Sequence, residues 1–324
     1  MKIINIELTN VCPLHCPQCY CKNEGGKHID LSKAKRAVDE AVSDGVTLVN
    51  LSGGETLCYP DLYELISYSS HTGVSVNIAI SGWGFDCNTL DRLLAAGVNE
   101  ISVSLNGSNE RVNSYSREGF AYAIRALDVI RQSSYHNACI NWVMQRNNAD
   151  DFPNMVELAE RYDIGKILII VYKPDSNHHI DQFPTTAQIR YVSDCIRQYR
   201  GQVKLEIEAC FSQLRALAYR SSWAGNLNIG PLKGCCAGRI AYSVNLDGDY
   251  SPCRHINYYE SFPSLAEYLQ GSEMIKRIHQ ADRCIGDTCA GCSYQKNCRP
   301  CLAIPFLTSG KIIYENRNCE LYKD

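Results

Sequence analysis

The stretch IINIELTNVCPLHCPQC, residues 3–19, joins a strand-like segment to three cysteines on one short loop. The apolar, β-branched residues of Ile3–Leu8 are typical of a buried strand. Cys12, Cys16 and Cys19 follow at a C-x3-C-x2-C spacing. Three thiolates on one loop reach three corners of a 4Fe–4S cluster and leave one iron open to another ligand.

A zinc site is the alternative interpretation of the same loop. Zinc in a structural site takes four ligands, and His15 or Cys21 would supply the fourth. Four ligands within ten residues form a cramped arrangement, so the spacing favours the cluster.

Outward from this loop, strand-like and helix-like segments alternate along the first 200 residues. The strand-like segments lie at Ile3–Leu8, Val46–Leu51, Val74–Ile80, Glu100–Leu105, Cys139–Met144 and Ile167–Tyr172. Amphipathic segments of helical period lie at Ser32–Asp44, Asp61–His71, Asn88–Ala96, Phe120–Gln132, Asp151–Tyr162 and Thr185–Tyr199. Six strand–helix units in series predict an α/β fold with a parallel sheet. Because eight units close a full barrel, we expect a partial, TIM-like (β/α)6 barrel.

Local signals support these boundaries. Gly45, Gly73 and Gly97 each stand between an expected helix and a valine, where glycine accepts the left-handed conformation that ends a helix. Expected helix N-caps are Asp30, Asn88 and Thr185.

The regular alternation of strand-like and helix-like segments ends after about residue 200. Val203–Glu208 and Phe211–Arg220 predict a further strand and helix, and from Cys235 onward the chain is rich in cysteine. The Asp-Gly pair at 247–248 predicts a hairpin with a tight two-residue turn, and Ser264–Ile278 predicts a short amphipathic helix. We therefore expect a barrel domain over 1–200, a bridging segment over 201–234 and, over 235–324, a small cysteine-rich α+β domain that folds around metal.

Composition narrows the function classes. The chain has 324 residues, 45% of them hydrophobic and 21% charged, which is ordinary for a globular protein. A net charge of −3 gives no basic surface for nucleic acid or for a membrane, and no segment is apolar enough to span a bilayer. The 18 cysteines and the lack of a secretory signal favour a reducing, cytoplasmic location, where clustered thiols indicate metal binding or catalysis.

The cysteine triad at the end of the first strand of a βα barrel resembles the radical S-adenosylmethionine (SAM) superfamily. The resemblance implies that Cys12, Cys16 and Cys19 hold a 4Fe–4S cluster whose open iron binds SAM. It also implies that reductive cleavage of SAM gives a 5′-deoxyadenosyl radical, which abstracts hydrogen from the substrate. Gln18 stands where many members have an aromatic residue, and Tyr20 follows the third cysteine.

Later residues match the same family's SAM-binding motifs. Gly53, Gly54 and Glu55 resemble its GGE motif, in which Glu55 would accept the SAM ammonium. Ser104 and Arg117 resemble the pair that holds the SAM carboxylate, a task that suits the planar guanidinium.

Three other features of the sequence accompany these motifs. Asn106 stands where the family has Asp, and Ser81-Gly82 resembles the family's Asn-Gly only weakly. Lys173-Pro174 lies at the expected catalytic end of the sheet, although an ordinary loop explains it equally well.

The cysteine-rich tail resembles the SPASM extension, which carries two auxiliary 4Fe–4S clusters in addition to the SAM-binding one. By resemblance Cys289, Cys292, Cys298 and Cys319 would hold the distal auxiliary cluster. Cys236, Cys253 and Cys301 would hold the nearer one, with a fourth ligand from Cys235, Cys210 or Cys284, or with a site left open for substrate. Cys298 and Cys301 are one residue closer than is usual, and a pair of zinc-ribbon sites is the alternative. The remaining thiols, among them Cys21, Cys58, Cys87, Cys139 and Cys195, are expected to be small buried hydrophobes.

The resemblance implies a maturase that modifies a ribosomally made peptide or small protein by a C–S or C–C cross-link or another oxidation. Expected partners are that substrate and a flavodoxin- or ferredoxin-type electron donor. Because the triad begins at residue 12 with no recognition domain before it, a separate leader-recognition protein, a leader bound directly by the barrel and a leaderless substrate are all open. An enzyme similar to anaerobic sulfatase maturases, or a small-molecule radical SAM dehydrogenase, is the first alternative. A non-catalytic iron–sulfur or zinc protein is the second. The sequence identifies neither the substrate, the bond formed, the general base nor the oligomeric state.

Overall fold

The structure is a computed structural model that describes residues 2–21, 25–174, 177–219, 227–228, 234–281, 285–295, 298–316 and 319–321. The chain divides into two compact units. The first comprises Met1–Ser104, Arg117–Cys139 and Ala237–Lys276, and the second comprises Leu105–Ser116, Ile140–Cys236 and Arg277–Asp324. The domain boundaries expected at residues 200 and 235 stay a prediction.

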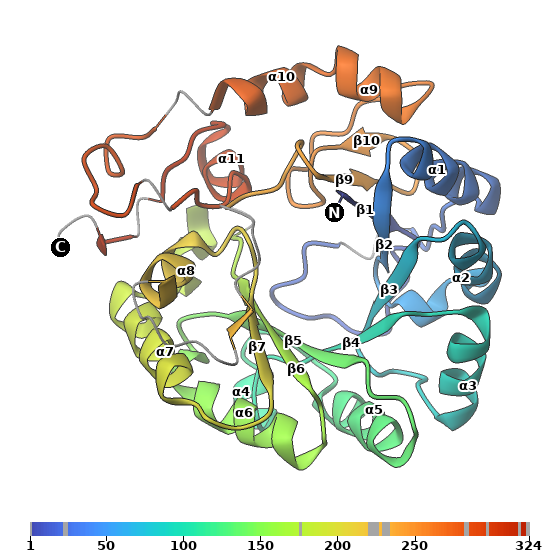
Figure 1. The fold of residues 1–324 in the computed structure, drawn as a ribbon, viewed down its shortest axis with the longest axis horizontal. Coiled ribbons are helices and arrows are strands. Elements are labelled where there is room, and N and C mark those ends of the chain that lie inside the picture. Colours follow the sequence, from blue (N-terminus) through green and yellow to red (C-terminus); the bar gives the residue numbers. More distant parts are fainter. Residues whose placement is uncertain are drawn as a thin grey trace. The chain divides into compact units, whose positions relative to one another are not determined.

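The first unit is built on strands in the order β10-β9-β1-β2-β3-β4, and each pair is parallel except β9 with β10. The strands are β1 (Lys2–Glu7), β2 (Val46–Ser52), β3 (Ser75–Ile80), β4 (Glu100–Ser104), β9 (Ala241–Val244) and β10 (Tyr250–Ser251). The helices are α1 (Leu31–Ser43), the 3-10 turn η1 (Thr56–Cys58), α2 (Leu62–His71), α3 (Cys87–Ala96), α5 (Phe120–Gln132) and α9 (Leu265–Gly271). Figure 1 shows α1, α2 and α3 along the outer side of β1, β2 and β3.

The second unit contains parallel strands in the order β5-β6-β7-β8. They are β5 (Ala138–Met144, whose first two residues fall in the first unit), β6 (Lys166–Val171), β7 (Lys204–Ile207) and β8 (Leu227–Asn228). The helices are α4 (Glu110–Asn113), η2 (Ala149–Asp151), α6 (Phe152–Arg161), η3 (Asn177–Gln182), α7 (Thr186–Gln198), α8 (Ser212–Tyr219) and α11 (Ala303–Ser309). The helix α10 (Glu273–Gln280) contributes residues to both units. These parallel strands with intervening helices confirm the predicted α/β class.

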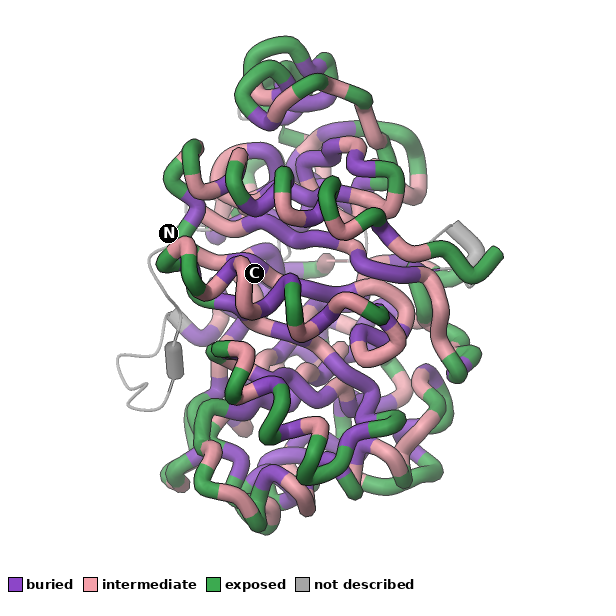
Figure 2. The backbone as a smooth tube through the Cα atoms, turned by 90° about the vertical axis from the view of Figure 1, so that its right-hand side faces the viewer, coloured by how far each residue is buried: buried purple, intermediate pink, exposed green. Residues whose placement is uncertain are grey.

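Burial follows the hydrophobic pattern of the sequence. In α1 the buried residues Ala34, Ala37, Val38 and Ala41 are spaced for one helix face, and Figure 2 shows buried and exposed residues alternating along the surface helices. Ile4 and Ile6 on β1 are fully buried. The core is therefore formed where the inner helix faces meet the strands.

Three local predictions were wrong in detail. The cap of α3 is Asp86 rather than Asn88, because the Asp86 carboxylate accepts the Thr89 N–H. The hairpin between β9 and β10 forms, but its loop is longer than the predicted two residues, since the Asn245 N–H bonds to the Asp249 carbonyl and the Gly248 N–H bonds to the Asn245 carbonyl. The helix expected over Ser264–Ile278 is two helices, because Ser272 ends α9 and its hydroxyl accepts the Ile275 N–H at the start of α10. Asp30 and Thr185 are confirmed as caps.

Candidate metal and cofactor sites

The cysteine loop of the first unit starts at Thr9, a fully buried residue directly after β1. The Thr9 hydroxyl accepts the Val11 N–H at 2.9 Å and donates to the Lys27 carbonyl at 3.2 Å. The Asn10 N–H also donates to the Lys27 carbonyl. These bonds fix both ends of the loop base, so the cysteines project from a rigid support.

Cys12, Cys16 and Cys19 lie within electrostatic range of one another. Burial raises the pKa of the Cys12 thiol to about 11; a backbone hydrogen bond from Leu14 opposes the rise, and the negative charges of Glu55 and the two other thiols add to it. The Glu118 N–H donates to the Cys16 sulfur at 3.4 Å. Thiolates in one loop that repel one another and receive backbone N–H bonds form a donor set that fits a 4Fe–4S cluster.

Gly53 and Gly54 bring the end of β2 against this loop. The Gly54 N–H donates to the Thr9 carbonyl at 2.6 Å, and the Glu55 N–H donates to the Val11 carbonyl at 2.8 Å. A Cβ atom on Gly53 would lie 2.3 Å from the Thr9 oxygen, and one on Gly54 would lie 2.3 Å from the Val11 oxygen. The glycines are thus needed for backbone to pass backbone directly before Cys12.

Glu55 is buried, with 1% of its surface exposed, and its carboxylate is held at both oxygens. One oxygen accepts the Leu57 N–H at 3.2 Å, and the other accepts the Ser81 N–H at 2.8 Å and the Ser81 hydroxyl. Burial raises the pKa of Glu55, while the Ser81 hydrogen bonds and the positive charge of Arg117 lower it. Ser81, only weakly indicated by the sequence, therefore orients the acid.

Arg117 is brought to the same site, as the motif predicted. Its guanidinium acts electrostatically on both Glu55 and the Cys19 thiol. Ser104, the expected partner of Arg117, is the half-buried last residue of β4. A half-buried arginine beside the cluster loop can bind a carboxylate, so this part of the site suits the amino-acid end of SAM.

Two loops of the first unit meet beside the triad, a contact that sequence analysis missed. Tyr20 follows Cys19, and Arg254 and His255 follow Cys253. The Arg254 guanidinium donates to the Tyr20 hydroxyl at 3.3 Å, and the Tyr20 and His255 rings meet edge to face at 4.8 Å. The contact joins segments more than 200 residues apart in the sequence, and no local motif predicts it.

The second unit holds a cavity of about 250 Å³ lined by all four thiols expected at the distal auxiliary cluster: Cys289, Cys292, Cys298 and Cys319. Burial raises the pKa of Cys298, and the three other thiols raise it further. Tyr294 and Leu321 pack against three of these thiols, those of Cys292, Cys298 and Cys319. Four thiols around one cavity form a donor set that fits a cubane cluster.

The remaining expected ligands are placed less completely. The second unit contains the buried Cys301 and the half-buried Cys235 and Cys236, whereas Cys253 belongs to the first unit. Cys284 lies outside the described residues. The grouping of Cys236, Cys253 and Cys301 stays a prediction.

Among the described residues, no group of three His, Cys, Asp or Glu converges on a single metal ion. Each thiolate on a cubane cluster binds a different iron, so a cluster does not require such convergence. Of the thiols expected to be small buried hydrophobes, Cys139 is fully buried and Cys21 is buried but donates to the Glu7 carboxylate at 3.1 Å. Cys87 is exposed at the start of α3, so that expectation was wrong there.

The described part of the chain has no helix long and apolar enough to cross a membrane.

Comparison with known proteins agrees with this geometry. Residues 6–159 match the radical SAM superfamily. The mycofactocin maturase MftC of Mycolicibacterium smegmatis is 28% identical over 93% of this chain and 78% of its own length. The AdoMet-dependent heme synthase of Methanosarcina barkeri is 23% identical over 98% of this chain and 96% of its own length.

Among solved structures, SuiB of Streptococcus suis bound to its precursor peptide SuiA matches with a TM-score of 0.78 at 18% identity. The match covers 98% of this chain and 75% of SuiB, and SuiB has also been solved bound to S-adenosylmethionine. The fold is therefore that of a radical SAM partial barrel followed by a cysteine-rich C-terminal region. Residues 6–159 form a radical SAM domain, a class of domain that uses a 4Fe–4S cluster and SAM.

Proposed function

We propose that this protein is a radical SAM/SPASM oxidoreductase that modifies a ribosomally made peptide or small protein. The observation that carries the proposal is the presence of two separate thiol sites, the triad beside Glu55 and Arg117 and the four-thiol cavity of the second unit. Support also comes from relatives that include a maturase and from the likeness to a peptide-bound enzyme.

In this proposal Cys12, Cys16 and Cys19 hold the SAM-binding cluster, and bound SAM supplies the radical that removes a hydrogen atom from the substrate. Arg117 and Ser104 bind the SAM carboxylate. Gly53 and Gly54 keep the backbone close to the triad, and Glu55, oriented by Ser81, accepts the SAM ammonium with its remaining lone pairs.

The auxiliary clusters would accept the electron that the substrate loses during the reaction. After the substrate loses a hydrogen atom, formation of a cross-link or double bond requires the loss of one further electron and one proton. An auxiliary cluster is a suitable acceptor for that electron. We propose two such clusters, one held by Cys289, Cys292, Cys298 and Cys319 and the other including Cys236, Cys253 and Cys301.

The proposal extends to partners and location. The first cluster requires a one-electron donor of the flavodoxin or ferredoxin type, and the substrate leader peptide is bound by a separate recognition protein. A cytoplasmic location fits the many free thiols among the described residues, because thiols persist in a reducing compartment.

The test is anaerobic reconstitution followed by incubation with dithionite, SAM and short peptides encoded beside the gene. We expect 5′-deoxyadenosine together with a peptide that has lost about two hydrogen masses by mass spectrometry. The Cys16→Ala variant should form neither product. Absence of 5′-deoxyadenosine from the wild-type protein would remove the radical SAM assignment in favour of a non-catalytic iron–sulfur or zinc protein.

A small-molecule substrate is the second candidate, because a heme synthase relative aligns with nearly the whole chain. Peptide modification predicts that a cognate peptide raises the rate of 5′-deoxyadenosine formation over the rate without it. Stimulation by a small molecule, with every peptide unchanged in mass, would favour the second candidate.

A further inference from the structure

Three cysteines of the second unit meet at a point that the family motifs do not account for. The Cys301 thiol is hydrogen-bonded to both Cys210 and Cys235. Cys301 precedes α11, Cys210 lies between β7 and α8, and the Cys235 N–H bonds to the Arg299 carbonyl. Cys210 and Cys301 are both buried, at 9% and 2% exposure. Thiols from three distant segments therefore meet in this unit, two of them buried and that of Cys235 half-buried.

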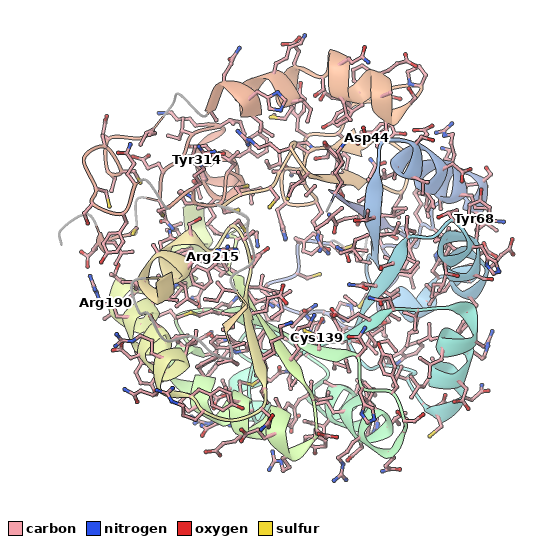
Figure 3. All side chains as sticks on the ribbon, viewed as in Figure 1. Asp44, Tyr68, Cys139, Arg190, Arg215 and Tyr314 are labelled. Carbon is pink, nitrogen blue, oxygen red and sulfur yellow. The ribbon has the colours of Figure 1, made fainter. Side chains whose placement is uncertain are left out.

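Two buried cations face these thiols. The Lys173 side chain is 4% exposed; its ammonium donates to both Glu208 oxygens, at 3.0 and 2.9 Å, and to the Val171 carbonyl at 3.1 Å. Its charge acts on Cys210 and Cys301, and the Glu208 carboxylate also faces Cys210. Arg215, on α8 and labelled in Figure 3, is 8% exposed and acts on Cys210 and Cys236.

The charges around these thiols suit a metal cluster. Burial of a cation is costly unless a negative partner compensates it. Glu208 compensates Lys173, whereas the anions that act on Arg215 are the Cys236 and Cys210 thiolates and, less strongly, the Glu206 carboxylate. An iron–sulfur cluster with cysteinate ligands carries the negative charge that this environment favours.

The position of Cys210 agrees with a cofactor site. Lys173 follows the carboxyl end of β6 and Cys210 follows the carboxyl end of β7, the edge at which parallel sheets bind their ligands. Cys210 is also held firmly, because the Phe211 N–H bonds to the Glu208 carbonyl and Phe211 is fully buried.

We propose that Cys210 is a ligand of the auxiliary iron–sulfur cluster that includes Cys301, with Lys173 and Arg215 compensating its charge. The proposal rests on the function proposed above and selects Cys210 over Cys235 and Cys284. On binding, the Cys210 thiol releases one proton to solvent and its sulfur forms one bond to iron, and the site itself gains or loses no electron.

The test compares Cys210→Ala with Cys139→Ala, a matched control that removes an equally small, fully buried thiol from β5. Both variants and the wild type are reconstituted anaerobically, and iron, sulfide and electron paramagnetic resonance spectra are measured before and after ferricyanide oxidation. The wild type and the control should hold about twelve irons, four for each of three clusters. Cys210→Ala should either lose about four irons or show a 3Fe–4S signal on oxidation that the control lacks.

Several results would overturn the proposal: unchanged iron content and spectra in Cys210→Ala, the same changes arising only in Cys235→Ala, or a disulfide between Cys210 and Cys301 in the reconstituted protein. If Cys210→Ala fails to fold by circular dichroism, Cys210→Ser replaces it, since a serine ligand keeps the cluster but shifts its spectrum. An unshifted serine spectrum contradicts the proposal.

The outcome is separable from that of the proposed function. Cleavage of SAM without substrate depends on the Cys12 triad, so 5′-deoxyadenosine formation by the wild type tests the proposed function, whereas the iron and spectroscopic comparison tests Cys210. If no peptide were modified by the wild type, the iron and spectroscopic comparison would still decide the role of Cys210.

Discussion

Replacement of Gly54 by alanine should sharply destabilise the radical SAM domain, because the new Cβ would lie 2.3 Å from the Val11 oxygen and 2.7 Å from the Val11 carbonyl carbon. Carbon contacts in proteins are comfortable near 3.5 Å, so the two segments must separate by about 1 Å. That separation breaks the hydrogen bonds from Gly54 to Thr9 and from Glu55 to Val11. Each buried group left without a partner costs about 1–3 kcal/mol, and overpacking adds about 1–3 kcal/mol. We therefore expect a loss of at least about 3 kcal/mol in the free energy of unfolding.

The matched control is Gly165→Ala. A Cβ on Gly165 meets no atom within 4 Å, and its backbone does not adopt the left-handed conformation. Alanine there should stabilise the protein by about 0.4–1 kcal/mol, because it reduces the freedom of the unfolded chain.

Both Gly variants are measured by anaerobic urea unfolding of the cluster-free protein with excess reductant. Reconstituted Gly54→Ala should in addition lose the cluster of the Cys12 loop, which its backbone supports. A Gly54→Ala protein within about 1 kcal/mol of wild type would refute the close backbone approach, because overpacking alone costs about that much.

Lys173→Met should lower the free energy of unfolding, measured in urea, by about 2–3 kcal/mol. This loss is below the range for fully buried pairs, because 27% of the Glu208 side chain is exposed. The double variant with Glu208→Gln should recover most of the loss, and no recovery would contradict the ion pair. Asn106→Asp should cost about 1–3 kcal/mol, since Asn106 is buried and its amide donates to the Ser116 hydroxyl at 2.9 Å. Burial raises the pKa of a carboxyl group, so the loss of unfolding free energy in Asn106→Asp should be larger at pH 8 than at pH 5. Equal losses in unfolding curves at the two pH values would show that the site is solvated. Burial also raises the pKa of Glu7 above its ordinary 4.5, although its hydrogen bond to Cys21 and the charge of Arg254 oppose the rise. The stability that Glu7 contributes is therefore present below pH 4.5 and is lost as the pH rises through its folded-state pKa. Glu7→Gln should gain stability relative to wild type over that pH range. A difference in unfolding free energy that does not change with pH would exclude the raised pKa of Glu7.

The sequence predicted the regular elements well because each carries its own signal. The helix Phe120–Gln132 agrees to the residue, and the expected strand Val203–Glu208 appears as Lys204–Ile207. Hydrophobic period and the helix-ending glycines at 45, 73 and 97 are local properties, and all three glycines adopt positive φ. The resemblance to the SPASM extension had grouped Cys289, Cys292, Cys298 and Cys319, and these four residues line one cavity.

The contacts that complete the sites could not be predicted in the same way. Ser81 holds Glu55 across two neighbouring strands, and the meeting of Cys210 with Cys301 depends on how the tail of the second unit folds back on β7. Asn106 shows the limit within a motif, because it stands where the family has Asp. Its amide N–H donates to the Ser116 hydroxyl and its amide oxygen accepts the Val143 N–H. A carboxylate can accept a hydrogen bond but cannot donate one. Such partners depend on tertiary contacts rather than on residue spacing.

The pairing of β9 with β1 has a consequence for synthesis of the chain. Ile6 on β1 aligns with Val244 on β9, so the strand that carries the cysteine loop waits for a neighbour made about 240 residues later. At about 5–20 residues per second a ribosome needs roughly 10–50 s to supply it. During that interval β1 presents an unpaired strand edge, the kind of surface at which nascent chains associate wrongly. A truncated chain that ends after the radical SAM domain would keep this edge permanently and should aggregate, so the tail acts as the last structural strand of the barrel as well as a metal-binding region.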